Sequence, residues 1–129
     1  MIFGAHLGLW RALLATAVLA ACYMAFLPEP PRVPGDPPDT YLHALAFAVL
    51  AGLSRLSFPD AGFWRILSAL TALGLAIECV QAIPALGREA SAVDWAIDIA
   101  ASSVVLVLLA PFARKAMHKS RPRERSGGR

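Results

Sequence analysis

The sequence predicts an all-α integral membrane protein, a four-helix bundle with both termini in the cytoplasm. Of its 129 residues 57% are hydrophobic and only 16% are charged, and the mean hydropathy is +0.58. This composition is too apolar for an ordinary soluble domain. The apolar residues form four continuous segments, each near the ~20 residues that a helix needs to cross a bilayer: 7–27, 41–57, 62–83 and 92–113. Continuous rather than alternating apolar character favours helices over strands.

The distribution of charge sets the predicted orientation, because Lys and Arg in short loops stay on the cytoplasmic side. With four spans, ten of the twelve basic residues lie on the side of the termini: Arg11, Arg55, Arg65, Arg114, Lys115, Lys119, Arg121, Arg123, Arg125 and Arg129. The other side holds Arg32, Arg88 and seven of the nine acidic residues. We therefore predict one domain over residues 1–117 and a disordered basic tail over 118–129. The tail is interpreted as a topology anchor on lipid headgroups, and no nucleic-acid partner is expected.

The first apolar segment has a competing interpretation as a cleaved signal sequence. A four-residue stretch that ends at Cys22 resembles the cleavage box of bacterial lipoproteins, but apolar sequence continues to Leu27 and favours a retained span. Cleavage at Cys22 would leave the remaining topology unchanged. Cys22 and Cys79 both lie in the outer halves of spans, where two small buried thiols are expected more often than a disulfide.

Residues 28–39 contain six of the ten prolines and should form a stiff connection across the outer surface. Asp39 precedes the next apolar run and is a good N-cap residue. His43 lies four residues later on the same face, about one turn into the membrane. A lone histidine in an apolar helix is usually a packing residue. Because its depth matches that of the other polar groups, a functional role for His43 stays open.

Glu78 and Gln81 lie three residues apart and share a face at the outer end of the third segment. An ionised carboxylate without a partner is costly at this depth, so Glu78 should point into the bundle. The loop that follows supplies a candidate partner in Arg88, whose guanidinium can hold a carboxylate through two hydrogen bonds. Small residues over 68–74 suit close helix packing in lipid.

The fourth segment begins with a sequence typical of a capping box, in which Ser91 is the N-cap residue and Asp94 reaches back to the first amides. Asp98 lies one turn beyond Asp94 on the same face and inside the apolar run. Capping therefore cannot explain Asp98. The helix is expected to meet Pro111 near its end and to leave the membrane at Arg114.

These spaced polar residues resemble the pattern of the VanZ-like membrane proteins: Asp39 with His43, Glu78 with Gln81, and Arg88 with Asp94. The resemblance covers nearly the whole chain in order. The chain departs from the pattern at Thr40, where a lysine is common, and at Asp98, where an asparagine is usual. The family is named after an accessory protein of glycopeptide-antibiotic resistance. The resemblance therefore implies a multi-pass protein of the bacterial cytoplasmic membrane with a cell-envelope role, and no established reaction.

The predicted topology brings seven polar positions to the outer leaflet as one ligand-binding site: Asp39, His43, Glu78, Gln81, Arg88, Asp94 and Asp98. Four carboxylates then accompany one guanidinium. Crowded carboxylates in a low dielectric are either protonated or joined by a cation, so a divalent cation is a candidate cofactor.

Three functions remain open at the level of sequence. The favoured one is binding of an envelope lipid or a glycopeptide-type headgroup at the outer face. The second is an enzyme that acts on a lipid-linked substrate, with His43 or Glu78 as general base and a divalent ion to polarise a phosphoryl group. The sequence has no nucleophile elbow, zinc-spaced histidine pair or phosphate-binding glycine loop, which ranks the enzyme lower. In the third, the polar cluster only ties helices together.

Overall fold

The computed structural model describes residues 2–32 and 34–119, and within these ranges the chain is helical with no strand. Each of the four long helices corresponds to one predicted apolar segment, with ends that differ by a few residues: α1 (Ile2–Phe26), α2 (Asp39–Ser57), α3 (Phe63–Gln81) and α4 (Ala92–Lys119). A short 3-10 helix, η1 (Pro84–Leu86), lies between α3 and α4. The all-α prediction is confirmed. Of the predicted tail over 118–129, residues 120–129 lie outside the described residues.

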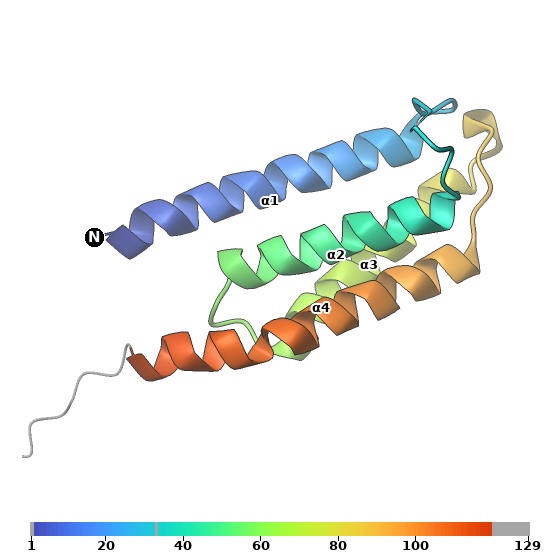
Figure 1. The fold of residues 1–129 in the computed structure, drawn as a ribbon. Helices are drawn as coiled ribbons and strands as arrows, with labels where there is room; N and C mark the ends of the chain where they lie inside the picture. The colour runs from blue at the N-terminus through green and yellow to red at the C-terminus, as the bar shows by residue number, and fades with distance from the viewer. Residues whose placement is uncertain (1, 33, 120–129) are drawn as a thin grey trace, which may run out of the picture.

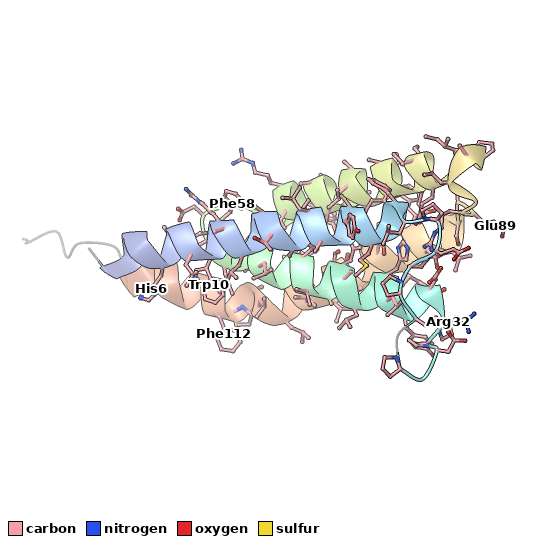
Figure 2. The ribbon with its side chains drawn as sticks, turned by 90° about the horizontal axis from the view of Figure 1, so that it is seen from above. His6, Trp10, Arg32, Phe58, Glu89 and Phe112 are labelled. Carbon is pink, nitrogen blue, oxygen red and sulfur yellow. The ribbon has the colours of Figure 1, made fainter. Side chains whose placement is uncertain are left out.

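The four helices lie side by side and alternate in direction (Figure 1). Two long-range hydrogen bonds fix this order. Near the start of α1, Arg11 Nε donates to the carbonyl of Ser57 at the end of α2 (3.3 Å). At the other end of the bundle, Gln81 Nε2 donates to the carbonyl of Ala25 in the last turn of α1 (3.0 Å). The α1–α2 and α3–α4 connections therefore share one end, here called the two-loop end, where Figure 2 labels Arg32 and Glu89.

Helices α2 and α3 each contact the other three long helices, and the most extensive packing in the bundle is between α2 and α4. Helix α2 contributes Phe47, Leu50 and Ala51 to the buried core, where they meet apolar side chains of α3 and Leu106 of α4. None of the described side chains of α1 is fully buried. The core thus belongs to α2, α3 and α4, and α1 covers one side of it.

Three helices are long and apolar enough to cross a membrane: His6–Phe26, Phe63–Gln81 and Ala92–Phe112. Helix α2 is not among them, since it carries Asp39, His43 and Arg55 within its 19 residues. All four helices expose large apolar side chains, among them Leu19, Tyr41, Trp64, Leu108 and Phe112. An outer surface of this kind suits lipid better than water.

Two arginines at the end opposite the two-loop end hold backbone carbonyls. Arg11 binds the Ser57 carbonyl and lies 5.3 Å from the centre of the Phe58 ring. Arg55 Nη1 donates to the carbonyl of Ala61 (2.7 Å). Carbonyls at the C-terminal end of a helix lack intrahelical donors, so these guanidinium groups stabilise the end of α2 and the turn into α3.

Helix α4 approaches α3 closely at Gly74. A Cβ atom at this position would lie 3.1 Å from Asp98 Oδ2 and 3.2 Å from Trp95 Cδ1. Trp95 is itself fixed, because its Nε1 donates to the carbonyl of Thr71 (3.1 Å). Gly74 is one of the small residues that were predicted to allow close packing. A larger side chain at this position would press on Asp98 and Trp95, which have little room to move.

We expect Gly74→Ala to lower the melting temperature of the protein in detergent. Overpacking costs about 1–3 kcal/mol and outweighs a gain in helix propensity of about 1 kcal/mol. Gly52→Ala is the matched control, because its Cβ would meet only Val105, at 4.0 Å. It should leave the melting temperature unchanged or raise it. Equal behaviour of the two variants would show that α3 and α4 are not tightly packed at Gly74.

Candidate functional site

Polar side chains from three helices meet inside the bundle at the two-loop end. His43 of α2, Glu78 of α3 and Asp94 of α4 each place one potential ligand atom so that all three atoms lie within 4.8 Å of one another. Asp98 contacts Nδ1 of His43. We call these four residues the histidine cluster. The structure thus brings together four of the seven predicted site residues, and the other three lie around the cluster with different partners.

The innermost contact of the histidine cluster joins α2 to α4. His43 Nδ1 lies 3.3 Å from Asp98 Oδ1 and 3.4 Å from Asp98 Oδ2. Asp98 is only 1% exposed. A carboxylate that binds one ring nitrogen fixes the orientation of the imidazole and leaves Nε2 for another partner. This contact gives Asp98 the role that helix capping could not explain.

Glu78 is buried and only half satisfied. Its Oε2 accepts a short hydrogen bond from the backbone N–H of Ser91 (2.6 Å), just before α4 begins. Its Oε1 is buried and has no hydrogen-bond partner among the described residues. A buried oxygen without a partner costs free energy. The hydrogen bond from Ser91 satisfies only one of the two carboxylate oxygens of Glu78.

The start of α4 differs in part from the predicted capping box. Ser91 Oγ accepts a hydrogen bond from the backbone N–H of Asp94 (3.1 Å), as an N-cap residue should. Asp94 does not reach back to the cap. Its Oδ1 instead accepts a hydrogen bond from Thr40 Oγ1 in α2 (2.8 Å), which orients the Asp94 carboxylate toward the cluster and links α2 to α4.

The expected pair of Arg88 with Glu78 is wrong. Arg88 Nη2 lies 3.4 Å from Asp39 Oδ2, a single long contact at the rim of the site. Asp39 is also not the N-cap residue of α2: that position belongs to Pro38, and Asp39 is the first helical residue. There the carboxylate is still favourable, because it lies near the positive end of the helix dipole. The Asp39 side chain is 58% exposed, whereas that of Arg88 is only 14% exposed, so solvent reaches the pair mainly from the side of Asp39.

Gln81 forms its hydrogen bond with α1 and not with the histidine cluster. It is buried, and its side-chain amide donates to the Ala25 carbonyl (3.0 Å). The last carbonyls of a helix have no intrahelical donor, and Gln81 satisfies one of them. The bond holds the end of α1 against the end of α3. Sequence spacing placed Gln81 beside Glu78 correctly but could not show that it faces another helix.

An apolar cavity of about 690 Å³ lies beside the site, between α1, the proline-rich loop and α2. Small side chains of α1 line one wall, and Asp39, His43 and Arg88 line part of its boundary. A second, polar pocket of about 390 Å³ is formed at the rim by residues that include Arg88, Ser91 and Asp94. The apolar cavity was not predicted from the sequence, although the alanines of α1 that line it recur at helical spacing: Ala17, Ala20, Ala21 and Ala25.

The two cysteines are free in the structure, with Cys22 half-buried and Cys79 exposed. The expectation of two buried thiols is therefore wrong for Cys79.

No protein-family model, curated protein or solved structure matches the chain.

We expect a double-mutant cycle of His43→Leu and Asp98→Leu to show coupling. Polar contacts between helices in a membrane protein contribute about 0.6–1.7 kcal/mol, and the double variant should recover roughly that amount relative to the sum of the single variants. The measurement is the free energy of unfolding in mixed micelles. A cycle of His43→Leu with Asp60→Leu, at the opposite end, is the control and should be additive. Additivity in both cycles would contradict the contact.

Proposed function

We propose that the chain is a four-span protein of the bacterial cytoplasmic membrane, VanZ-like in its pattern of polar residues, whose two-loop end faces outward and binds an amphiphile. The ligand class is an envelope lipid or a glycopeptide-type compound with an anionic headgroup. The observation that carries this proposal is the position of the apolar cavity, which lies directly beside the Arg88–Asp39 pair and His43.

The proposed topology rests on the distribution of charge over the two ends of the bundle. Arg11 and Arg55 hold carbonyls at the end opposite the two-loop end, and Arg65 lies in the first turn of α3 near them. Basic residues of this kind mark the cytoplasmic side. Helix α2 is not among the helices that are apolar enough to cross a membrane by themselves. A span that packs against three others needs an apolar surface only on its exposed face, where Tyr41 and Leu45 lie. This arrangement supports four spans with both termini in the cytoplasm.

The proposed ligand follows from the two halves of the site. Ligand sites are typically apolar cavities with a few polar groups that fix orientation. The walls of the cavity come from alanines, prolines and aliphatic side chains, which suit an acyl chain or another apolar group. Arg88 makes only one long contact, to an exposed carboxylate. A single 3.4 Å contact to an exposed carboxylate contributes little stability, so a phosphate or carboxylate headgroup can replace Asp39 as the partner of Arg88.

Catalysis on a lipid-linked substrate is the second candidate function. The observation that favours it is the His43–Asp98 contact, because a carboxylate that orients an imidazole is a common arrangement for a general base. The binding function needs only Arg88 and the cavity and makes no use of His43 as a base. Turnover of a lipid-linked substrate that is lost in His43→Gln would favour the enzyme.

We expect residues of the two-loop end to be accessible from outside the cytoplasmic membrane. In a Cys22→Ser, Cys79→Ser background, Glu29→Cys should react with a membrane-impermeant maleimide in intact bacterial spheroplasts. Asp60→Cys, in the connection between α2 and α3, should react only after permeabilisation. The reverse pattern would overturn the orientation, and labelling of both positions in intact spheroplasts would contradict the four-span topology.

We expect anionic phospholipid to raise the melting temperature of the protein in detergent, and phosphatidylglycerol is the probe. Arg88→Gln should weaken the apparent affinity about tenfold, because a hydrogen bond to a charged group contributes about 1.5–3 kcal/mol. Ala46→Phe, which adds a ring to the apolar lining of the cavity and leaves Arg88 unchanged, should weaken the affinity as well. Glycerol phosphate, which has the anionic group without the acyl chains, should bind poorly.

The matched controls for this titration lie outside the site. Arg65→Gln removes a positive charge at the opposite end, and Ala76→Phe adds the same ring to an exposed position on α3. Both should bind phosphatidylglycerol like the unmodified protein. If Arg65→Gln and Arg88→Gln lose affinity equally, the lipid covers the bundle without a specific site and the proposal fails. A response to a glycopeptide but not to phosphatidylglycerol would select the second ligand type.

A further inference from the structure

We propose that the histidine cluster binds one divalent transition-metal ion of the Zn²⁺ or Mn²⁺ type, with His43, Glu78 and Asp94 as ligands and Asp98 as the residue that orients His43. This inference does not depend on the proposed lipid binding, which uses Arg88 and the cavity. The three ligands come from three different helices, so the ion would join α2, α3 and α4 at the two-loop end.

The three potential ligand atoms are near enough to one another to surround one ion. One such atom of each residue lies within 4.8 Å of the other two. Bonds from Zn²⁺ to imidazole nitrogen and carboxylate oxygen are about 2.0–2.2 Å, so neighbouring ligands of a tetrahedral ion lie about 3.3–3.6 Å apart. Binding of an ion therefore requires the three atoms to approach one another by up to about 1.5 Å.

The unpaired oxygen of Glu78 is an independent sign of a missing partner. Glu78 is only 6% exposed, and its Oε1 is buried without a hydrogen bond among the described residues. Its Oε2 is held by the Ser91 amide at 2.6 Å, so the carboxylate cannot easily turn its free oxygen to another donor. A buried carboxylate oxygen of this kind is expensive unless something binds it. A cation between His43 and Asp94 satisfies it.

Each of the three ligand residues is already oriented by one neighbour. Asp98 binds Nδ1 of His43, the Ser91 amide binds Oε2 of Glu78, and Thr40 binds Oδ1 of Asp94. Each residue therefore has a second atom that makes none of these contacts, and the proposal assigns these atoms to the ion: Nε2, Oε1 and Oδ2. A histidine that binds a metal usually donates its other ring N–H to a carboxylate. This hydrogen bond fixes the ring and makes the metal-binding nitrogen more basic.

The donor set selects the class of metal. One imidazole and two carboxylates suit Zn²⁺, Mn²⁺ and similar ions, whereas Mg²⁺ and Ca²⁺ prefer oxygen ligands alone. The charge also fits, since the cluster contains three carboxylates and Arg88 is paired with Asp39 outside it. The polar pocket at the rim touches Asp94 and gives an ion a route from the two-loop end. It also leaves room for water at the remaining coordination positions.

The test is metal binding by the full chain, purified in detergent and treated with a chelator that is then removed. Zn²⁺ and Mn²⁺ are added separately, and bound metal at equilibrium is measured by elemental analysis together with the melting temperature. We expect one ion per chain and a higher melting temperature with at least one of the two ions. Mg²⁺ and Ca²⁺ at the same concentrations should bind at least tenfold more weakly.

Variants separate a metal site from general attraction of cations to acidic groups. Glu78→Gln and His43→Gln should each weaken binding at least tenfold, and Asp98→Asn, which touches no ion, should weaken it about 10–100-fold through His43. Glu29→Gln is the matched control, because it removes an exposed carboxylate at the same end of the protein. It should bind like the unmodified chain.

The melting temperatures of the variants without metal show whether a substitution affects folding as well as metal binding. Without metal, Glu78→Gln should melt at the same or a higher temperature than the unmodified protein, because it removes a buried charge that lacks a full set of partners. Uptake of less than a tenth of an ion per chain at saturating Zn²⁺ and Mn²⁺ would overturn the proposal. So would equal losses in Glu78→Gln and Glu29→Gln. Phosphatidylglycerol binding that persists in the chelator-treated protein would support the proposed function alone.

Discussion

The contact between His43 and Asp98 is the constraint on which the rest of the structure depends. Asp98 is almost completely buried in a helix that is otherwise apolar, so it needs a partner from another helix. Helix α2 supplies that partner, and the most extensive helix packing in the bundle is between α2 and α4. Gly74 then provides the space that the carboxylate needs. The buried polar contact thus lies within the closest helix pair of the bundle.

Two kinds of polar contact occupy the two-loop end, and they differ in how firmly they are held. Inside the bundle, Glu78 and Asp94 each accept one short hydrogen bond, which fixes their orientation. At the rim, Arg88 and Asp39 meet through one long contact that is open to solvent. Fixed groups are suited to an ion, whose ligands must be preorganised. A loose pair is suited to a larger ligand that exchanges one partner for another.

The helices and the location of the site could be predicted from the sequence, but the partners of the site residues could not. Apolar runs define the helices, and charge within those runs indicated His43, Glu78 and Asp98. The pairing of Arg88 depends on the path of a loop, and sequence spacing does not determine that path. Gln81 faces α1 because of the order in which the helices pack, which is a tertiary property. The cavity beside α1 depends on the same packing.

The close approach at Gly74 also has an evolutionary consequence. A side chain at this position and a carboxylate at Asp98 compete for the same space, since a Cβ there would lie 3.1 Å from Oδ2. A related chain with a larger residue in place of Gly74 has to shorten or lose the residue at Asp98, and its histidine then loses its partner. The residues at positions 43, 74 and 98, on three different helices, should therefore covary among homologues.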